Sequence, residues 1–174
     1  MKIKKGKRPV FDRRASIEAL KQLEEERAIR RGYDMALVAS AAILWWVHGF
    51  HAEDIRRLSK DIRMLEDTLA QETRDGTWEE NAKARLSGIW EELGIDTLEW
   101  SDTQGLSNSE AIGAAIALET VICALHDDDY FVVSDEELKE YYQEFMQRAR
   151  EYGMGKWNMA YERRILEREM ENDS

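Results

Sequence analysis

The sequence predicts an all-α protein, a bundle of about seven helices made of two repeated three-helix units plus an N-terminal helix. Composition is the first reason. The 174 residues include a single proline and no Gly/Ser-rich stretch, and residues that favour helix dominate. With 43% hydrophobic residues the chain can bury a core, so we expect one compact domain or two small halves that share a core.

The second reason is an internal repeat, visible as two apolar, alanine-containing runs that each end in histidine. At an offset of 78 residues, Ala39 pairs with Ala117 and His48 with His126. An acidic helix start follows each run. Trp78 and Trp157 are then expected to open the last helix of each unit. Self-similarity of this kind predicts two copies of one helical unit packed on each other.

The chain is expected to begin with a basic flexible arm at residues 1–11, followed by a charged N-terminal helix at residues 12–31. In the arm, lysines and arginines repel one another and Pro9 disfavours helix in the residue before it. Gly32 is expected to break or bend the chain after the N-terminal helix.

Residues 32–100 are expected to form the first helical unit, with helices at 35–48, 52–73 and 77–93. The first of these helices is apolar nearly all round, which places it in the middle of the bundle. The second has an apolar stripe and a polar face, and is expected to lie on the first.

Residues 101–174 are expected to form the second helical unit, with helices at 109–126, 134–152 and 156–170. Ser109 is a suitable N-cap for the first helix. Ser134 is expected to cap the second, with Glu137 completing a capping box. Small residues should let the two central helices cross closely, namely Ala36, Ala39, Ala114 and Ala117.

Charge is strongly partitioned along the chain. The net charge is −11, yet residues 1–31 hold 11 Lys and Arg against 5 Asp and Glu, so the remaining residues carry −17. An acidic body repels nucleic acid and attracts basic surfaces, whereas a basic arm does the reverse. The alternative interpretation is that the acidic face only confers solubility.

The candidate partner-binding surface combines clustered acids with an adjoining apolar patch. Clustered carboxylates can approximate a row of phosphates, and aromatic residues are common anchors at protein interfaces. The candidate residues are Asp127, Asp128, Asp129, Tyr130, Phe131, Asp135, Glu136, Glu137 and Glu140. The apolar patch at residues 130–133 either folds back as core or anchors a partner.

The alternative binding surface is the basic N-terminal region, which would bind nucleic acid. Its candidate residues are Lys2, Lys4, Lys5, Lys7, Arg8, Arg13 and Arg14. Binding of a duplex through these side chains should weaken steeply with salt, because it depends on the release of counterions.

Signals of an enzyme are weak. His48, His51 and Glu53 could form a metal or acid–base site, but the two histidines lack the i,i+4 spacing that places two imidazoles side by side on a helix. No phosphate-binding glycine loop is present, and Cys123 lies in an apolar run rather than in the setting of a nucleophile. We therefore expect no catalytic residue, no metal and no cofactor.

The protein is expected to be cytoplasmic. Its single cysteine, Cys123, cannot form an internal disulfide, which fits a reducing compartment. The charged N-terminus is not followed by an apolar signal region, and the longest apolar stretch, residues 35–47, is too short to cross a bilayer.

The segments Asp12–Leu20 and Arg31–Ala36 resemble small helical proteins of phages and prophages of Gram-positive bacteria, most of which have no assigned function. The resemblance covers roughly residues 12–96 and is compositional. It implies a non-enzymatic protein that binds and inhibits or regulates a basic, nucleic-acid-handling host protein. A CRISPR nuclease is one such partner, which would make the protein an anti-CRISPR inhibitor.

Overall fold

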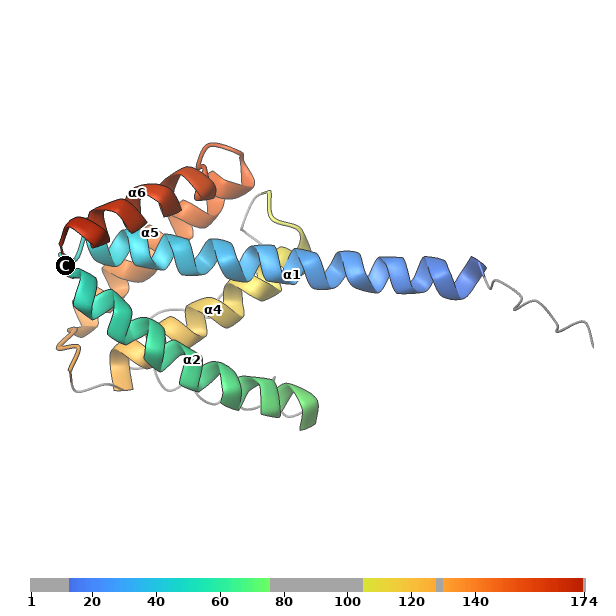
Figure 1. The fold of residues 1–174 in the computed structure, drawn as a ribbon, viewed down its shortest axis with the longest axis horizontal. Coiled ribbons are helices and arrows are strands. Elements are labelled where there is room, and N and C mark those ends of the chain that lie inside the picture. Colours follow the sequence, from blue (N-terminus) through green and yellow to red (C-terminus); the bar gives the residue numbers. More distant parts are fainter. Residues whose placement is uncertain (1–12, 76–104, 128–129, 174) are drawn as a thin grey trace, which may run out of the picture.

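The computed structural model describes residues 13–75, 105–127 and 130–173, and within these ranges it shows five α-helices and no strand. The helices are α1 (Arg13–Trp46), α2 (Ala52–Asp75), α4 (Asn108–Asp127), α5 (Asp135–Gly153) and α6 (Met159–Asn172) (Figure 1). The prediction of an all-α protein is confirmed. The number of about seven helices is wrong for the described residues; the helix predicted at 77–93 lies outside them.

Helix α1 continues without a break through Gly32, where the sequence predicts the end of the N-terminal helix. The glycine serves packing instead. A β-carbon at Gly32 would overlap the backbone carbonyl of Glu110, so the missing side chain lets α1 approach α4 closely. A glycine inside a helix costs about 1 kcal/mol relative to alanine. Packing against α4 offsets that cost, and the boundary expected between residues 31 and 32 falls inside one helix.

Helix α4 meets α1 at the same place with a glycine of its own. A β-carbon at Gly113 would overlap the backbone carbonyl of Ile29. Small residues continue the contact on both helices, and four alanines are fully buried, namely Ala36, Ala39, Ala114 and Ala117. The close crossing expected from these alanines is therefore present, with the two glycines at its tightest point.

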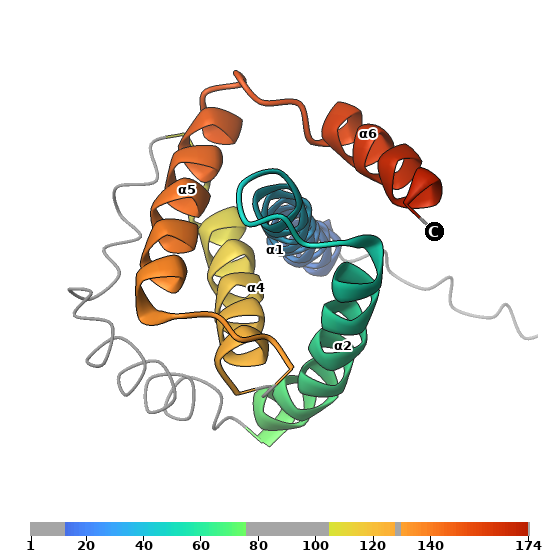
Figure 2. The same cartoon turned by 90° about the vertical axis from the view of Figure 1, so that its left-hand side faces the viewer.

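Helix α1 lies at the centre of the bundle, and α5, α4, α2 and α6 are arranged around it (Figure 2). Helix α5 packs on α1, where the Ser40 and Tyr141 hydroxyls share a buried hydrogen bond of 2.6 Å. Helix α2 packs mainly on α4. It buries Ile55 and Leu58 on one face, as its predicted apolar stripe requires.

The described residues do not bear out the predicted repeat of two three-helix units. In the first half, the N-terminal and central helices are one helix of 34 residues, and α4 has no such extension before Asn108. In the second half, Trp157 does not open the last helix; it is buried in the turn before α6, which begins at Met159. Trp78 lies outside the described residues. The two apolar runs resemble each other in sequence because both are buried, and they do not belong to equivalent structural units.

The helix starts follow the predicted capping chemistry with two corrections. At α5 the capping box of Ser134 and Glu137 is present as predicted. At α4 the cap is Ser107 rather than Ser109, because Ser107 pairs with Glu110 in a second capping box. Helix α6 is capped by Asn158, whose side chain accepts the Tyr161 N–H, so it starts three residues after the predicted Lys156.

Helix α4 is long and apolar enough to cross a membrane by length and composition alone. The core helix of a bundle has the same properties. Most of this segment is buried inside the protein, including Leu118, Val121 and Ile122.

Candidate functional site

One end of the bundle gathers acidic residues from three helices. Helix α1 ends there, α2 and α5 begin there, and α6 ends there (Figure 1, left). We call this surface the acidic end and define it by Glu53, Asp54, Asp135, Glu136, Glu140, Glu171 and Asp173. Most of these residues are exposed. The surface therefore combines part of the predicted binding residues with acids that lie far from them in the sequence.

Two turns meet at the acidic end, the one that precedes α2 and the one that precedes α5. The rings of Phe50 and Phe131 stack, with centroids 5.6 Å apart and planes 12° from parallel. Beside them, the Tyr130 hydroxyl donates a hydrogen bond of 3.1 Å to Asp54 Oδ1. An apolar stack and a polar contact thus attach the turn before α5 to the start of α2.

The end of α6 is attached to the start of α2. Asp173 Oδ2 accepts a 2.9 Å hydrogen bond from the Ala52 N–H and lies 3.5 Å from His51 Nδ1. Asp54 Oδ2 accepts the His51 N–H at 2.8 Å. Carboxylates are favourable at a helix N-terminus, because the first N–H groups lack partners and carry partial positive charge. Asp54 and Asp173 therefore have a structural role as well as a charge.

The predicted apolar patch is divided between core and surface. Phe131 is buried in the stack described above, whereas Val132 is 93% exposed and Tyr130 is 44% exposed. The guanidinium of Arg57 lies 3.9 Å from the centre of the Tyr130 ring. The hydrogen bond to Asp54 and the negative charge of that carboxylate raise the pKa of Tyr130. Val132 and Tyr130 therefore form a small exposed tip beside the acids.

The predicted acids differ in how they are used. Asp135, Glu136 and Glu140 are exposed. The carboxylate of Glu137 instead accepts hydrogen bonds from the backbone and hydroxyl of Ser134, and these bonds lower its pKa. Asp127 is the last residue of α4. Asp128 and Asp129 lie outside the described residues.

Two of the predicted basic residues begin α1, and the other end of this helix lies at the acidic end. Arg13 and Arg14 occupy the first turn of α1, and the helix has 34 residues. At 1.5 Å per residue, about 50 Å separates its two ends. The five predicted basic residues before them, Lys2, Lys4, Lys5, Lys7 and Arg8, lie outside the described residues. The start of α1 is thus far from the acidic end.

The histidines have separate surroundings. The His48 ring lies 6.5 Å from the ring of buried Tyr141, whereas His51 faces Asp173. Within the described ranges, no group of three or more histidine, cysteine, aspartate or glutamate side chains is placed to hold a metal ion. The geometry around His48, His51 and Glu53 therefore gives no support to a metal site.

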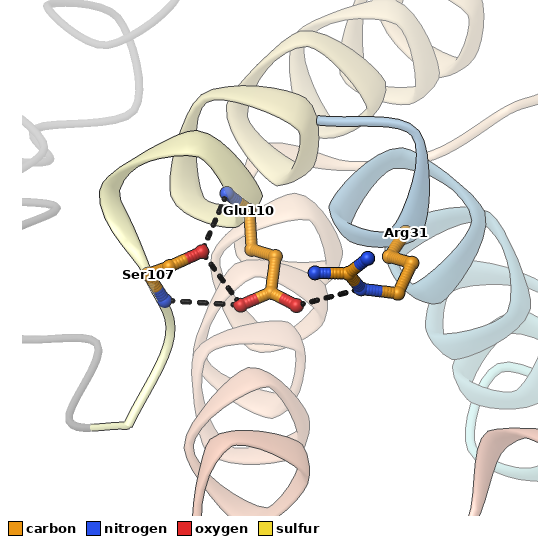
Figure 3. Close-up of polar contacts among 3 residues, drawn as sticks. All are labelled: Arg31, Ser107 and Glu110. Atoms are coloured by element: carbon orange, nitrogen blue, oxygen red, sulfur yellow. Dashed lines mark hydrogen bonds and ion pairs between the residues drawn. The ribbon is translucent and has the colours of Figure 1, made fainter. Parts of the chain in front are cut away.

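A polar network joins α1 to α4 next to the glycine crossing (Figure 3). Glu110 Oε1 accepts a 3.1 Å hydrogen bond from Arg31 Nε, and Glu110 Oε2 accepts bonds of 3.1 and 2.7 Å from the N–H and hydroxyl of Ser107. Burial alone would raise the pKa of Glu110, but the bonds from Ser107 and Arg31 outweigh it and lower the pKa. We interpret this network as a tie between helices, since both carboxylate oxygens of Glu110 accept hydrogen bonds from groups of the protein, one of them from Arg31 on α1.

The network predicts a pH dependence of stability. Because the pKa of Glu110 in the folded protein is below its ordinary value of 4.5, ionised Glu110 stabilises the fold above that pH. The stabilisation should be lost as the pH falls through the lowered pKa. Urea unfolding between about pH 3 and pH 6 should show a smaller pH dependence for Glu110→Gln than for the unaltered protein. An unchanged slope would contradict this account of the Glu110 network.

Comparisons with protein-family models, with curated proteins and with solved structures found no match for this chain.

Proposed function

We propose that this protein is a non-enzymatic binding protein that inhibits or regulates a basic, nucleic-acid-handling protein through the acidic end. The observation that supports this proposal most is that one end of the bundle carries acids from α2, α5 and α6, with exposed Tyr130 bonded to Asp54 and Val132 exposed beside it. Charge at the rim of an interface accelerates and orients association, and apolar residues at its centre supply affinity.

The partner's binding surface should be positively charged and should offer a small apolar pocket. The exposed carboxylates at these helix starts present clustered negative charge, as a row of phosphates does, so a groove that normally holds nucleic acid has the matching charge. A CRISPR nuclease is a specific candidate, which follows from the resemblance to phage proteins. This assignment makes inhibition by competition with nucleic acid the expected mechanism.

The proposal predicts that reversing charge at the acidic end weakens binding. The variant Asp135→Lys/Glu136→Lys/Glu140→Lys should lose affinity for a captured basic nuclease by about tenfold or more, and Val132→Ser should lose affinity without changing charge. Purified CRISPR nucleases, with and without their nucleic acids, serve as binding partners in the assay. Binding should weaken as salt rises, because exposed charges are screened over about 8 Å at physiological ionic strength.

A matched control places the same kind of charge change elsewhere. Glu18→Lys/Glu24→Lys/Glu25→Lys reverses three exposed acids on α1, far from the acidic end, and should leave nuclease binding unchanged. Equal loss in both triple variants would mean that only net charge matters. Full binding by the acidic-end variant would mean that these acids serve solubility alone.

The alternative function is a nucleic-acid-binding accessory protein that uses the basic N-terminal region. The favouring observation is that Arg13 and Arg14 begin the half of α1 that extends away from the bundle (Figure 1). Tight, salt-sensitive duplex binding that disappears on removal of residues 1–14 would support this alternative over the first.

A further inference from the structure

Helix α6 is attached to the bundle by little apolar burial. Of its 14 residues only Leu166 is buried, whereas α5 buries the large rings of Tyr141 and Phe145 among others. A hollow of about 170 Å³ also remains between α1 and α6, where Val38 and Met170 are among the lining residues. Side chains that line a gap lose dispersion contacts, so the packing of α6 on α1 contributes less than that of α5.

The start of α6 is anchored to its neighbours. Trp157 lies in the turn before α6 and is buried, and its ring contacts Tyr152 of α5 with centroids 6.2 Å apart. In the first turn of α6, Glu162 accepts a 3.2 Å hydrogen bond from the indole N–H of Trp46. These contacts hold the beginning of α6 beside α5 and the end of α1.

The end of α6 is held by polar contacts with α2. Ala52 is 1% exposed, and its N–H donates to the carboxylate of Asp173, so without Asp173 this donor would lose its bond where little water can replace it. Arg56 also donates a 3.3 Å hydrogen bond to the carbonyl of Met170, in the last turn of α6. The exposed contact of Asp173 with His51 adds little.

A helix attached in this way can open while the rest of the bundle stays folded. A helix of about 14 residues without tertiary contacts is only marginally stable in water, so α6 should lose its helical hydrogen bonds once its end is released. Elements with few buried contacts open at a lower free energy than the whole fold. The main core lies in α1, α4 and α5, and opening of α6 would leave it in place.

We propose that α6 is a strap that opens and closes as a unit, with Trp157 at its fixed end and Asp173 as its latch. Figure 2 shows α6 at the edge of the bundle, with its C-terminal end near the start of α2. Glu171 and Asp173 belong to the acidic end, so opening of the strap removes two acids from that surface and closing restores them. This inference goes beyond the proposed function and does not depend on it, because the opening needs no partner.

The test is hydrogen exchange at individual amides of the full chain, without a partner, at urea concentrations below the unfolding transition. The amides of Ile165 and Leu166, in the middle of α6, should be protected at least about tenfold less than those of Leu118 and Ile122 in α4. Their exchange should also depend little on urea, because opening of one helix exposes little surface. Exchange of α6 with the same rate and the same urea dependence as α4 would overturn the proposal.

A pair of variants tests the latch. Asp173→Ala should raise the exchange rates of Ile165 and Leu166 by about tenfold or more and leave those of α4 unchanged. The control Glu171→Ala removes an exposed acid from the same end of α6 and should change these rates by no more than about twofold. Equal acceleration in the two variants, or no acceleration by Asp173→Ala, would contradict the role of Asp173. Since no partner is present, failure here is distinguishable from failure of the proposed function.

Discussion

Replacing Phe145 with alanine is expected to destabilise the fold by about 3–5 kcal/mol, the cost typical of truncating a fully buried aromatic side chain. Phe145 is completely buried on α5 and packs beside Tyr141, which shares a buried hydrogen bond with Ser40 of α1. The cavity left by the ring would weaken the attachment of α5 to α1. Equilibrium unfolding in urea, followed by helical circular dichroism, measures the loss.

The control for Phe145→Ala is Tyr161→Ala, which also removes an aromatic ring from a helix. Tyr161 lies on α6 and is 58% exposed, so its loss should change the free energy of unfolding by no more than about 0.5 kcal/mol. Similar losses in both variants would mean that α5 does not contribute to the core as the structure describes. Because α5 carries Asp135, Glu136 and Glu140, Phe145→Ala should also weaken any binding that depends on the acidic end.

Replacing Gly113 with alanine is expected to separate α1 from α4 and to destabilise the fold by about 2 kcal/mol. The added β-carbon would overlap the backbone carbonyl of Ile29, and backbone cannot rotate away as a side chain can. Overpacking of this kind costs about 1–3 kcal/mol or more. Alanine regains about 1 kcal/mol of helix propensity, which leaves a net loss. For a chain of this size the midpoint of thermal unfolding should fall by about 4–8 °C.

Gly155→Ala provides the comparison for Gly113→Ala. Gly155 has a φ of +67° and no atom within 4 Å of an added β-carbon, so alanine there meets backbone strain but no clash. The expected loss is about 1 kcal/mol. If Gly113→Ala proved as stable as the unaltered protein, the close α1–α4 crossing would be wrong.

Local features of the structure could be predicted wherever neighbours in the sequence decide them. The apolar stripe of α2 appears as buried Ile55, Leu58 and Ile62, because residues spaced by three or four share one face of a helix. The capping box of Ser134 and Glu137 forms because its groups lie three residues apart. Trp45 is half-buried and Trp46 largely exposed, as expected for adjacent helical residues that cannot face the same way.

Sequence patterns mislead where the role of a residue depends on a distant helix. Gly32 was predicted to end a helix, since glycine alone is a poor helix former, but the backbone of Glu110 on α4 makes glycine necessary there. Ser107 and Ser109 are both plausible caps by type. The cap used is Ser107, which pairs with Glu110. Glu110 also bonds to Arg31 on α1, 79 residues away, and the sequence pattern does not show this contact.

The candidate site shows the same division. The sequence identifies Asp135, Glu136 and Glu140 as clustered acids and Tyr130 as part of an apolar patch, because each cluster is contiguous in the chain. It offers no signal that Glu53, Asp54 and Asp173 join them. That association depends on the Phe50–Phe131 stack and on hydrogen bonds that span more than 70 residues.

The sequence by itself determined the helical class, the amphipathic face of α2, the cap of α5 and the opposite charges of the N-terminal region and the remaining chain. These properties depend on composition and on spacings of three to four residues, which a linear pattern records. The tertiary structure alone decided that α1 is one helix, that acids from three helices meet at one end, and that α6 buries only one of its residues. Each of these depends on which faces exclude water together, and that choice is made between segments far apart in the chain.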